Sequence, residues 1–293
     1  MNLVTITSRH GRSIAGFALL LLAPLASVSE AAVVAADTFT RADSTTLGST
    51  EVGSFAWNER LTTGASANVA EILSGELLFE TGSSDLAIVN VGLTDLIVSA
   101  DVHFVGDTTG SGTTKSIGMV FRGSNMDSHM TSDAGNQGLA TIQFTNSGGL
   151  LIGENKAAGF AYGYNNNPFK PSLGDSQPYG NPGDLPATYN GLPFDADGDG
   201  RLQGDEPFQI GAVLSGTSLD VKINGLTIQT FTLENTGGVT GNYFALIKNN
   251  LGGVGNSPTG AFDNLTISNI PEPSTFTLLA ISLVAFAGRR RRS

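Results

Sequence analysis

The sequence contains no cysteine among its 293 residues. Disulfides, thiol catalysis and cysteine-ligated metal sites are therefore excluded, so an exported domain would depend on its core and on any metal it binds. Charged residues are also scarce, at 14% of the chain, and there are three histidines. Together with 38 glycines, this composition favours turn-rich β structure over helices.

Between the two termini, no segment shows a sustained 3.6-residue apolar period. Short β-type runs occur instead, and several alternate apolar with polar residues, as strands with one buried face do. The runs are 76–80, 86–91, 96–104, 116–121, 139–144, 149–152, 208–214, 219–223, 226–231, 243–247 and 262–267. Asn224-Gly225 predicts a two-residue hairpin, because both turn positions favour positive φ. The predicted fold class is all-β, an antiparallel two-sheet β-sandwich.

The N-terminus has the pattern of a secretory signal peptide. A basic stretch with Arg9 and Arg12 precedes an apolar run over 14–25, and small residues follow around Ala31. We expect residues 1–31 to form a cleaved signal helix, with the cut just after Ala31 or Ala32.

The C-terminus, 271–293, combines three parts. Pro271-Glu272-Pro273 comes first, then an uncharged apolar run, then Arg289, Arg290, Arg291 and Arg292. The run predicts a transmembrane helix over about 274–288. As a helix, the 13 uncharged residues from Phe276 to Gly288 span only ~20 Å of a ~30 Å hydrocarbon core. The residues just before Phe276, snorkelling arginines and local thinning of the bilayer could close the gap. The arginines hold the C-terminus in the cytoplasm and place the preceding chain outside.

This order of parts resembles the PEP-CTERM sorting signal of bacterial exported proteins. The resemblance implies export through the inner membrane and transient anchoring by the C-terminal helix. It also implies processing near Pro271–Pro273 by an exosortase-type transpeptidase, with a final place at the cell surface or in the extracellular matrix. An ordinary single-span anchor is the alternative.

The region between these ends, 33–270, is strongly acidic. Nine basic and 24 acidic residues remain in it, a formal charge of −15. Such a surface repels nucleic acid and anionic lipid, and it suits divalent cations or neutral glycans. We therefore expect no nucleic-acid partner.

Several segments of this region resemble the concanavalin A-like (LamG-type) jelly roll. They are 37–43 with Leu47-Gly48, Trp57, 118–122, 208–214, 219–225 and 261–267. That family includes lectins, glycan-binding modules and glycoside hydrolases. The resemblance therefore implies a carbohydrate ligand class and leaves the activity open.

A long insertion, 154–207, contains the acidic segment 195–206, which we predict to be an EF-hand-like calcium loop. Ca²⁺ takes six to eight oxygen ligands, and a 12-residue loop can wrap around it. The predicted ligands are Asp195, Asp197, Asp199, the Arg201 carbonyl, Gln203 through water, and Glu206, with Gly200 at the bend. Pro193 and Pro207 flank the loop, so we expect an isolated calcium loop in a β domain; the alternative is an acidic solvated turn.

A second cation site is predicted at Asp37 and Asp263. Asp37 is expected to open the first strand, Asp263 lies in the last, and these two strands often lie together in sandwiches. The alternative is two surface acids at strand ends.

No catalytic motif is present. A retaining glucanase of this class would carry Glu-x-Asp-x-x-Glu on one strand, and neither that spacing nor a Gly-x-Ser-x-Gly elbow occurs. His103 is interpreted as a sheet-face residue. We expect a calcium-stabilised glycan-binding or structural module without catalytic residues, more consistent with a non-enzyme. The alternative is a polysaccharide-acting glycoside hydrolase or lyase-like enzyme.

Overall fold

The computed structural model describes the chain in a series of segments. They are residues 30–61, 70–79, 85–105, 115–123, 140–145, 150–154, 188–189, 192–193, 207–233, 241–250 and 259–271. The chain divides into two compact units, one spanning Ala32–Ile270 and the other made of Met1–Ala31 with Pro271–Ser293. The first unit contains all the strands that the structure describes.

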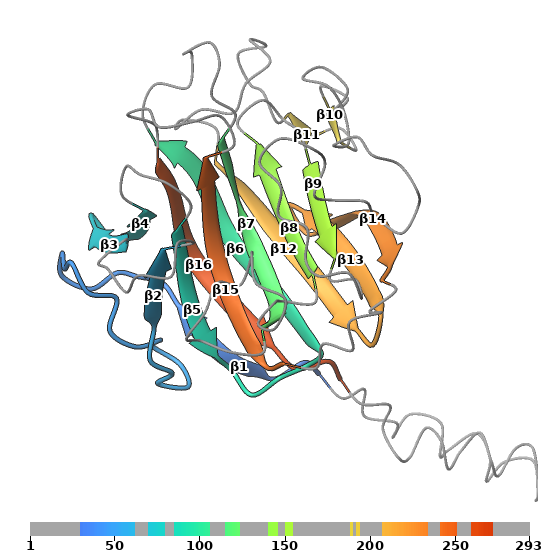
Figure 1. Ribbon diagram of the computed structural model, residues 1–293, viewed down its shortest axis with the longest axis horizontal. Coiled ribbons are helices and arrows are strands. Elements are labelled where there is room, and N and C mark those ends of the chain that lie inside the picture. Colours follow the sequence, from blue (N-terminus) through green and yellow to red (C-terminus); the bar gives the residue numbers. More distant parts are fainter. Residues whose placement is uncertain are drawn as a thin grey trace, which may run out of the picture. The chain divides into compact units, whose positions relative to one another are not determined.

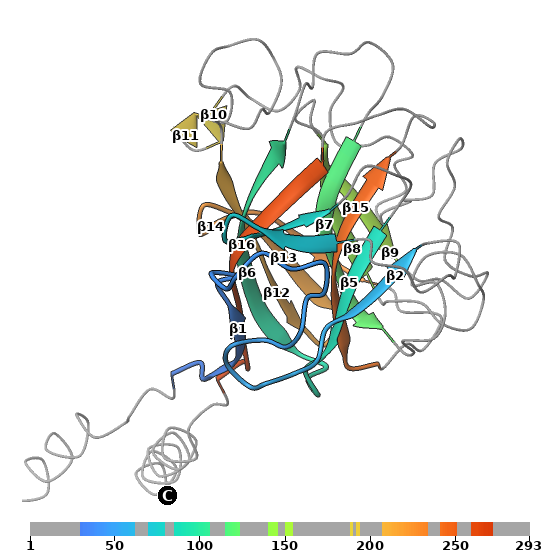
Figure 2. The ribbon, with the colours of Figure 1, turned by 90° about the vertical axis from the view of Figure 1, so that its left-hand side faces the viewer.

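Two antiparallel sheets form a sandwich (Figures 1 and 2). The eight-stranded sheet has the order β14-β13-β12-β6-β16-β4-β3, and β1 also pairs with β16. Its strands are β1 (Val33–Asp37), β3 (Ala70–Leu73), β4 (Glu76–Phe79), β6 (Leu96–Val105), β12 (Phe208–Ser215), β13 (Ser218–Ile223), β14 (Leu226–Thr232) and β16 (Thr259–Ser268).

The six-stranded sheet has the order β2-β5-β15-β7-β8-β9. Its strands are β2 (Asn58–Leu61), β5 (Asp85–Asn90), β7 (Lys115–Gly123), β8 (Ala140–Thr145), β9 (Leu150–Glu154) and β15 (Tyr243–Asn250). A separate pair, β10 (Thr188–Tyr189) and β11 (Leu192–Pro193), lies within the insertion. The predicted antiparallel two-sheet sandwich is confirmed.

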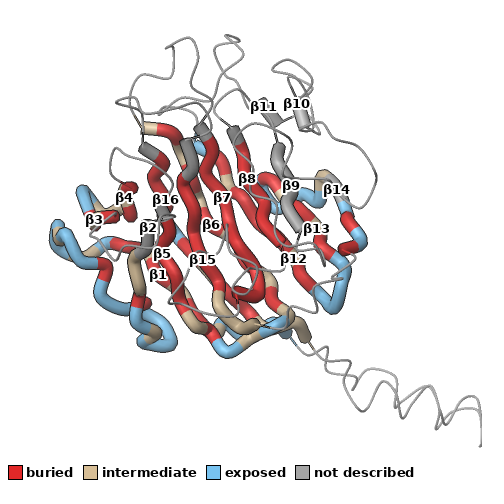
Figure 3. Tube along the Cα trace, viewed as in Figure 1, coloured by how far each residue is buried: buried red, intermediate tan, exposed pale blue. Residues whose placement is uncertain are grey.

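The main core lies between the sheets, where the inward positions of both are buried (Figure 3). β6 shows this alternation of inward and outward side chains clearly, because its ten residues alternate strictly between buried and intermediate exposure. Large aromatic rings fill the space, and Phe144 of β8 meets Phe208 of β12 edge-on at a centroid distance of 5.6 Å. Such contacts fasten one sheet to the other.

Arg122 makes a second connection between the sheets. It is the penultimate residue of β7, has φ of 54° and is buried. Its Nε donates to the Thr94 carbonyl at 2.7 Å, and its guanidinium pairs with Asp95, just before β6. Asp95 also accepts from the Gly216 N–H at 3.1 Å, in the turn between β12 and β13.

Each β-type run expected from the sequence coincides with a strand of the structure. The predicted hairpin is present as well: Asn224 and Gly225 join β13 to β14 with φ of 47° and 78°. Asp37, however, closes the first strand and does not open it. The run Val33–Ala36 was not among the expected strands, and in the structure it pairs with the last strand.

The expected terminal helices fall in 1–29 and 272–293, outside the described residues. Within the described part of the chain, no helix has the length and apolarity needed to cross a membrane.

Candidate functional site

The two sheets present very different outward faces. On the six-stranded sheet, the positions that point away from the main core form a second buried apolar cluster: Leu86, Ile88, Val120, Ala245 and Ile247, with Tyr243 packed against it. The neighbouring outward positions Ser116, Thr141 and Gln143 are also buried. Among the described outward residues of β5, β7, β8 and β15, there is no Asp or Glu.

The outward face of the eight-stranded sheet is polar and accessible. On β6, the residues between the core positions are Ile97, Ser99, Asp101, His103 and Val105, and each has intermediate exposure. Asp220 and Lys222 of β13 lie on the same face with similar exposure. This is therefore the sheet face on which the described residues can meet a polar ligand.

A row of amide and carboxylate side chains crosses this face at one level. We call it the polar row, and it consists of Asn224, Gln209, Asp101, Asn264 and Asp263. Strand register creates it, because Gln209 lies opposite Asp101 and Asp101 lies opposite Asp263. The row thus extends over the β13–β14 turn, β12, β6 and β16.

Hydrogen bonds connect the members of the polar row. The Gln209 amide donates to Asp101 Oδ1 at 3.2 Å, and its backbone N–H donates to Asn224 Oδ1 at 2.8 Å. The Asn264 amide donates to Asp101 Oδ2 at 3.0 Å and to Asp263 Oδ2 at 3.1 Å. Because these bonds fix the side chains, the row offers an ordered set of polar atoms.

A β-bulge places Asn264 in the row. The register of β16 against β6 shifts between Asp263 and Thr266, and Asn264 has φ of 49°. Asparagine adopts this left-handed conformation more readily than most residues, and bulges redirect side chains. The Asn264 N–H then donates to Asp263 Oδ1 at 2.7 Å.

In this region, the pKa of the Asp263 carboxyl is raised above its ordinary value. Partial burial raises the pKa of its carboxyl, and the nearby charges of Asp101, Glu51 and Asp37 raise it further. The backbone hydrogen bond from Asn264 lowers it in part. Burial, and to a lesser degree the neighbouring negative charges, thus make the ionised form of Asp263 more costly.

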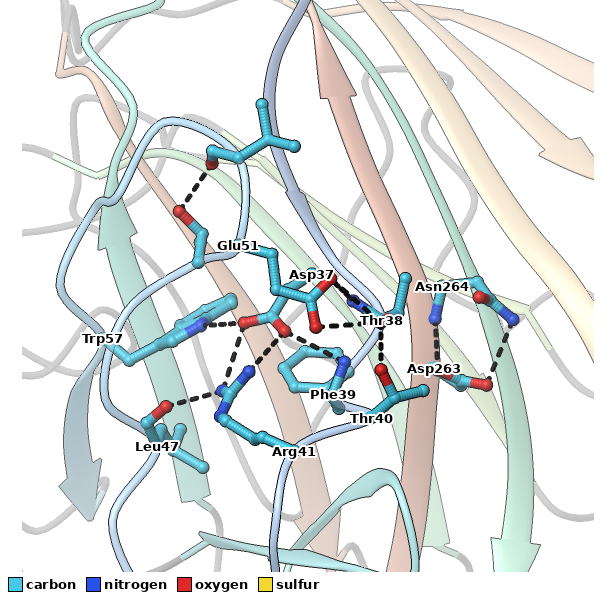
Figure 4. A network of polar contacts seen from close by, with 12 residues as sticks. Asp37, Thr38, Phe39, Thr40, Arg41, Leu47, Glu51, Trp57, Asp263 and Asn264 are labelled. Carbon is cyan, nitrogen blue, oxygen red and sulfur yellow. Dashed lines mark hydrogen bonds and ion pairs between the residues drawn. The ribbon is translucent and has the colours of Figure 1, made fainter.

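Asp37 lies close to this region but has a different environment (Figure 4). Its fully buried carboxylate accepts from Arg41 Nη1 at 2.6 Å, from Trp57 Nε1 at 2.8 Å and from the Phe39 N–H at 3.0 Å. Arg41 also donates to the Leu47 carbonyl at 2.6 Å. The carboxylate therefore organises the segment between β1 and β2.

The first and last strands do lie together, as the second predicted cation site requires. β1 pairs with β16, and Asp37 lies opposite Leu265. However, Asp37 is neutralised by Arg41, and no three Asp, Glu or His residues in the described segments are arranged to hold a metal ion. The structure gives the Asp37 and Asp263 site no support, and it stays a prediction.

The other predicted site residues lie mostly beyond the described segments. The calcium loop 195–206 is outside them, as are Glu272, Pro273 and the four terminal arginines; Pro271 is the last described residue. His103 lies on the outward face of β6, with Nε2 3.7 Å from a Glu76 carboxylate oxygen.

Sequence reasoning missed Gln209, Asp101 and Asn264 as members of one constellation. Their outward positions followed from alternation within runs that the sequence identified as strands. The missing information was which strands are neighbours and in what register, which no local pattern supplies.

One family comparison matches the end of the chain. Residues 269–292 are a PEP-CTERM protein-sorting motif. The motif indicates an exported protein that is anchored transiently at the membrane before sorting, and it implies processing by an exosortase. Among curated proteins, no relative matches the sequence.

Solved structures to which this chain is similar include carbohydrate-active and carbohydrate-binding proteins. An endo-β-1,3-glucanase from Pyrococcus furiosus has 12% identity and a TM-score of 0.49, covering 83% of this chain and 97% of that chain. A non-specific endo-β-1,3(4)-glucanase of family GH16 has 12% identity and a TM-score of 0.46, covering 85% and 98%. The Emp47p carbohydrate recognition domain has 11% identity and a TM-score of 0.44, covering 80% and 97%. At these scores, the likeness carries no argument about ligand or activity.

Proposed function

We propose that this exported protein is a cell-envelope or extracellular-matrix component whose sandwich binds a neutral glycan through the polar row. The observation that carries the proposal is the ordered row on the accessible face of the eight-stranded sheet. Amide groups both donate and accept, and carboxylates accept, so together they match the hydroxyl groups of a sugar. The acidic charge of the domain disfavours anionic polymers.

A calcium ion in the 195–206 loop is the second part of the proposal. Asp195, Asp197, Asp199, the Arg201 carbonyl and Glu206 would supply its oxygens, with Gln203 holding a water. The structure describes both flanks of the loop, β11 before it and β12 after it. Because β12 continues into the polar row at Gln209, an ordered loop would steady the start of that strand.

A specific observation keeps an enzyme as the alternative. Asp101 and Asp263 both accept from the Asn264 amide, at 3.0 and 3.1 Å. Their oxygens therefore lie no farther apart than these distances combined, near the roughly 5–5.5 Å of a retaining glycosidase pair. Binding is favoured because the Asn264 amide holds both carboxylates in place as acceptors, as the hydroxyl groups of a sugar require.

Binding of residues 32–270 to a panel of neutral oligosaccharides tests the proposal. Gln209→Ala should weaken binding about tenfold or more, because it removes an amide from the row. Thr230→Ala is the matched control, since it removes a 2.6 Å side-chain hydrogen bond to Asp220 on the same sheet. The proposal is wrong if no glycan binds, or if both variants bind as the wild type does. Release of reducing ends that stops in Asp263→Asn would establish the enzyme instead.

A further inference from the structure

The first and last residues of the sandwich are joined by two hydrogen bonds. The Ala32 N–H donates to Asn269 Oδ1 at 2.7 Å, and the Asn269 N–H donates to the Ala32 carbonyl at 3.0 Å. The next register pair inward is Val33 with Ser268, where β1 and β16 begin their ladder. The pair Ala32 and Asn269, which we call the clasp, therefore closes this end of the sheet.

Both expected processing points lie next to the clasp along the chain. The leader is expected to end at Ala31, which precedes Ala32 directly. The Pro-Glu-Pro element begins at Pro271, and only Ile270 separates it from Asn269. Two cuts that are far apart in the sequence thus flank one hydrogen-bonded pair.

We infer that the clasp couples the two processing steps: removal of the leader tightens it, and the tightened clasp slows cleavage at the Pro-Glu-Pro element. This inference rests on the proposed export and sorting of the protein. Hydrolysis of the Ala31–Ala32 peptide bond adds the hydroxyl of water to the Ala31 carbonyl and leaves the proton on the Ala32 nitrogen. The new amine has an ordinary pKa of about 7.7–8.0 and is mostly an ammonium at pH 7.

The ammonium changes the strength of the existing contact. In the precursor, a neutral amide N–H of Ala32 donates to Asn269 Oδ1. After the cut, the same nitrogen donates as a cation, and charge-assisted hydrogen bonds are shorter and roughly twice as strong as neutral ones. The strength of the hydrogen bond to the Asn269 side chain therefore depends on whether the leader has been removed.

A tighter clasp restricts the processing enzyme. Enzymes that cut a chain act on segments that have opened, and the cleavage rate follows the opened fraction when reclosing is fast. When Asn269 is hydrogen-bonded to Ala32, only Ile270 separates the end of the hydrogen-bonded chain from Pro271, which leaves little free chain for an enzyme to bind. Asn269 is therefore a positioning residue for the sorting step.

Pulse–chase labelling of the full chain in its native host, with a tag after Ser293, tests this inference. Asn269→Ala removes the acceptor and should speed loss of the tag several-fold, while Asn269→Asp keeps an acceptor and should restore the wild-type rate or a slower one. Asn90→Ala is the matched control, because it removes a 3.0 Å bond from the Gly92 N–H elsewhere in the sandwich; its rate should be that of the wild type.

The sign of the change in processing rate distinguishes the clasp from simple recognition of the motif. Asn269 lies within the matched motif, so a recognition role alone predicts slower processing in Asn269→Ala. Equal or slower loss of the tag in Asn269→Ala overturns the clasp and leaves sorting intact. Retention of the tag in every variant, the wild type included, overturns the proposed sorting and the clasp with it.

Discussion

The indole N–H of Trp57 donates a 2.8 Å hydrogen bond to the buried carboxylate of Asp37, 20 residues earlier in the chain. Arg41 and the Phe39 N–H complete the donors around that carboxylate. Phe39 itself has φ of 52° and is fully buried beside the Trp57 ring. One carboxylate therefore holds a strained, buried segment against the edge of the sandwich.

Replacing Trp57 with Phe should destabilise the sandwich by about 1–3 kcal/mol, because the variant keeps a ring but removes a donor from a buried acceptor. Urea unfolding of residues 32–270 measures the change. Val52→Ala, an exposed position in the same segment, is the control and should stay within about 0.5 kcal/mol of wild type. Equal stability of Trp57→Phe and wild type would contradict the assigned role of the network.

Gly118 allows β7 and β8 to approach closely. A Cβ at this position would lie 1.9 Å from the Ile142 carbonyl oxygen, so backbone would have to move. Gly118→Ala should cost about 3 kcal/mol or more, at or beyond the usual overpacking range. Gly216→Ala is the comparison, with φ of 57° and no atom within 4 Å of its Cβ. Its cost should be that of the left-handed conformation alone, about 1–2 kcal/mol. Thermal unfolding that ranks the two variants in the opposite order would refute the close approach.

The raised pKa of Asp263 gives the stability a defined pH dependence. Its native pKa lies above its unfolded value, so the native state binds the proton more tightly. Stability from this group is therefore fully present below the unfolded pKa and is lost as pH rises through the native pKa. Asp263→Asn cannot titrate, so wild type should gain stability relative to the variant as pH falls from 7 toward about 4. Urea midpoints across that range, in EDTA, test the sign; a relative loss would mean that the pKa is lowered.

How far the sequence predicts the fold depends on the element. Alternation in the run 96–104 located β6 and even its outward residues, and Asn224-Gly225 located a hairpin, because both are local properties. β2 and β3 are four residues each and carry charged side chains, so no local pattern distinguishes them from loops. Their pairing with β5 and β4 decides their conformation.

The candidate site was less predictable for the same reason. The sequence predicted that Asp37 is a cation ligand but not that Trp57 and Arg41 donate to its carboxylate, and the cation site stays a prediction. The polar row depends on the register between β12, β6 and β16 and on a bulge at Asn264. These are tertiary relationships, and residue types along one strand do not contain them.

Calcium binding is expected at the 195–206 loop. At free calcium about a hundred times the dissociation constant, linkage should stabilise the domain by ~2.7 kcal/mol, and magnesium should do less because it demands tighter octahedral geometry. Titration calorimetry on the wild type and on the double variant Asp195→Ala, Glu206→Gln measures calcium binding. If wild type and the double variant bind calcium alike, the loop is only an acidic turn.

The export and sorting of the protein can be tested most directly by mass spectrometry of the mature protein purified from its native host. The mature protein should begin at Ala32 or Val33 and should lack the apolar segment and the arginines that follow the Pro-Glu-Pro element. Recovery of the intact C-terminus through Ser293 from the membrane fraction would contradict the account and leave a plain membrane anchor.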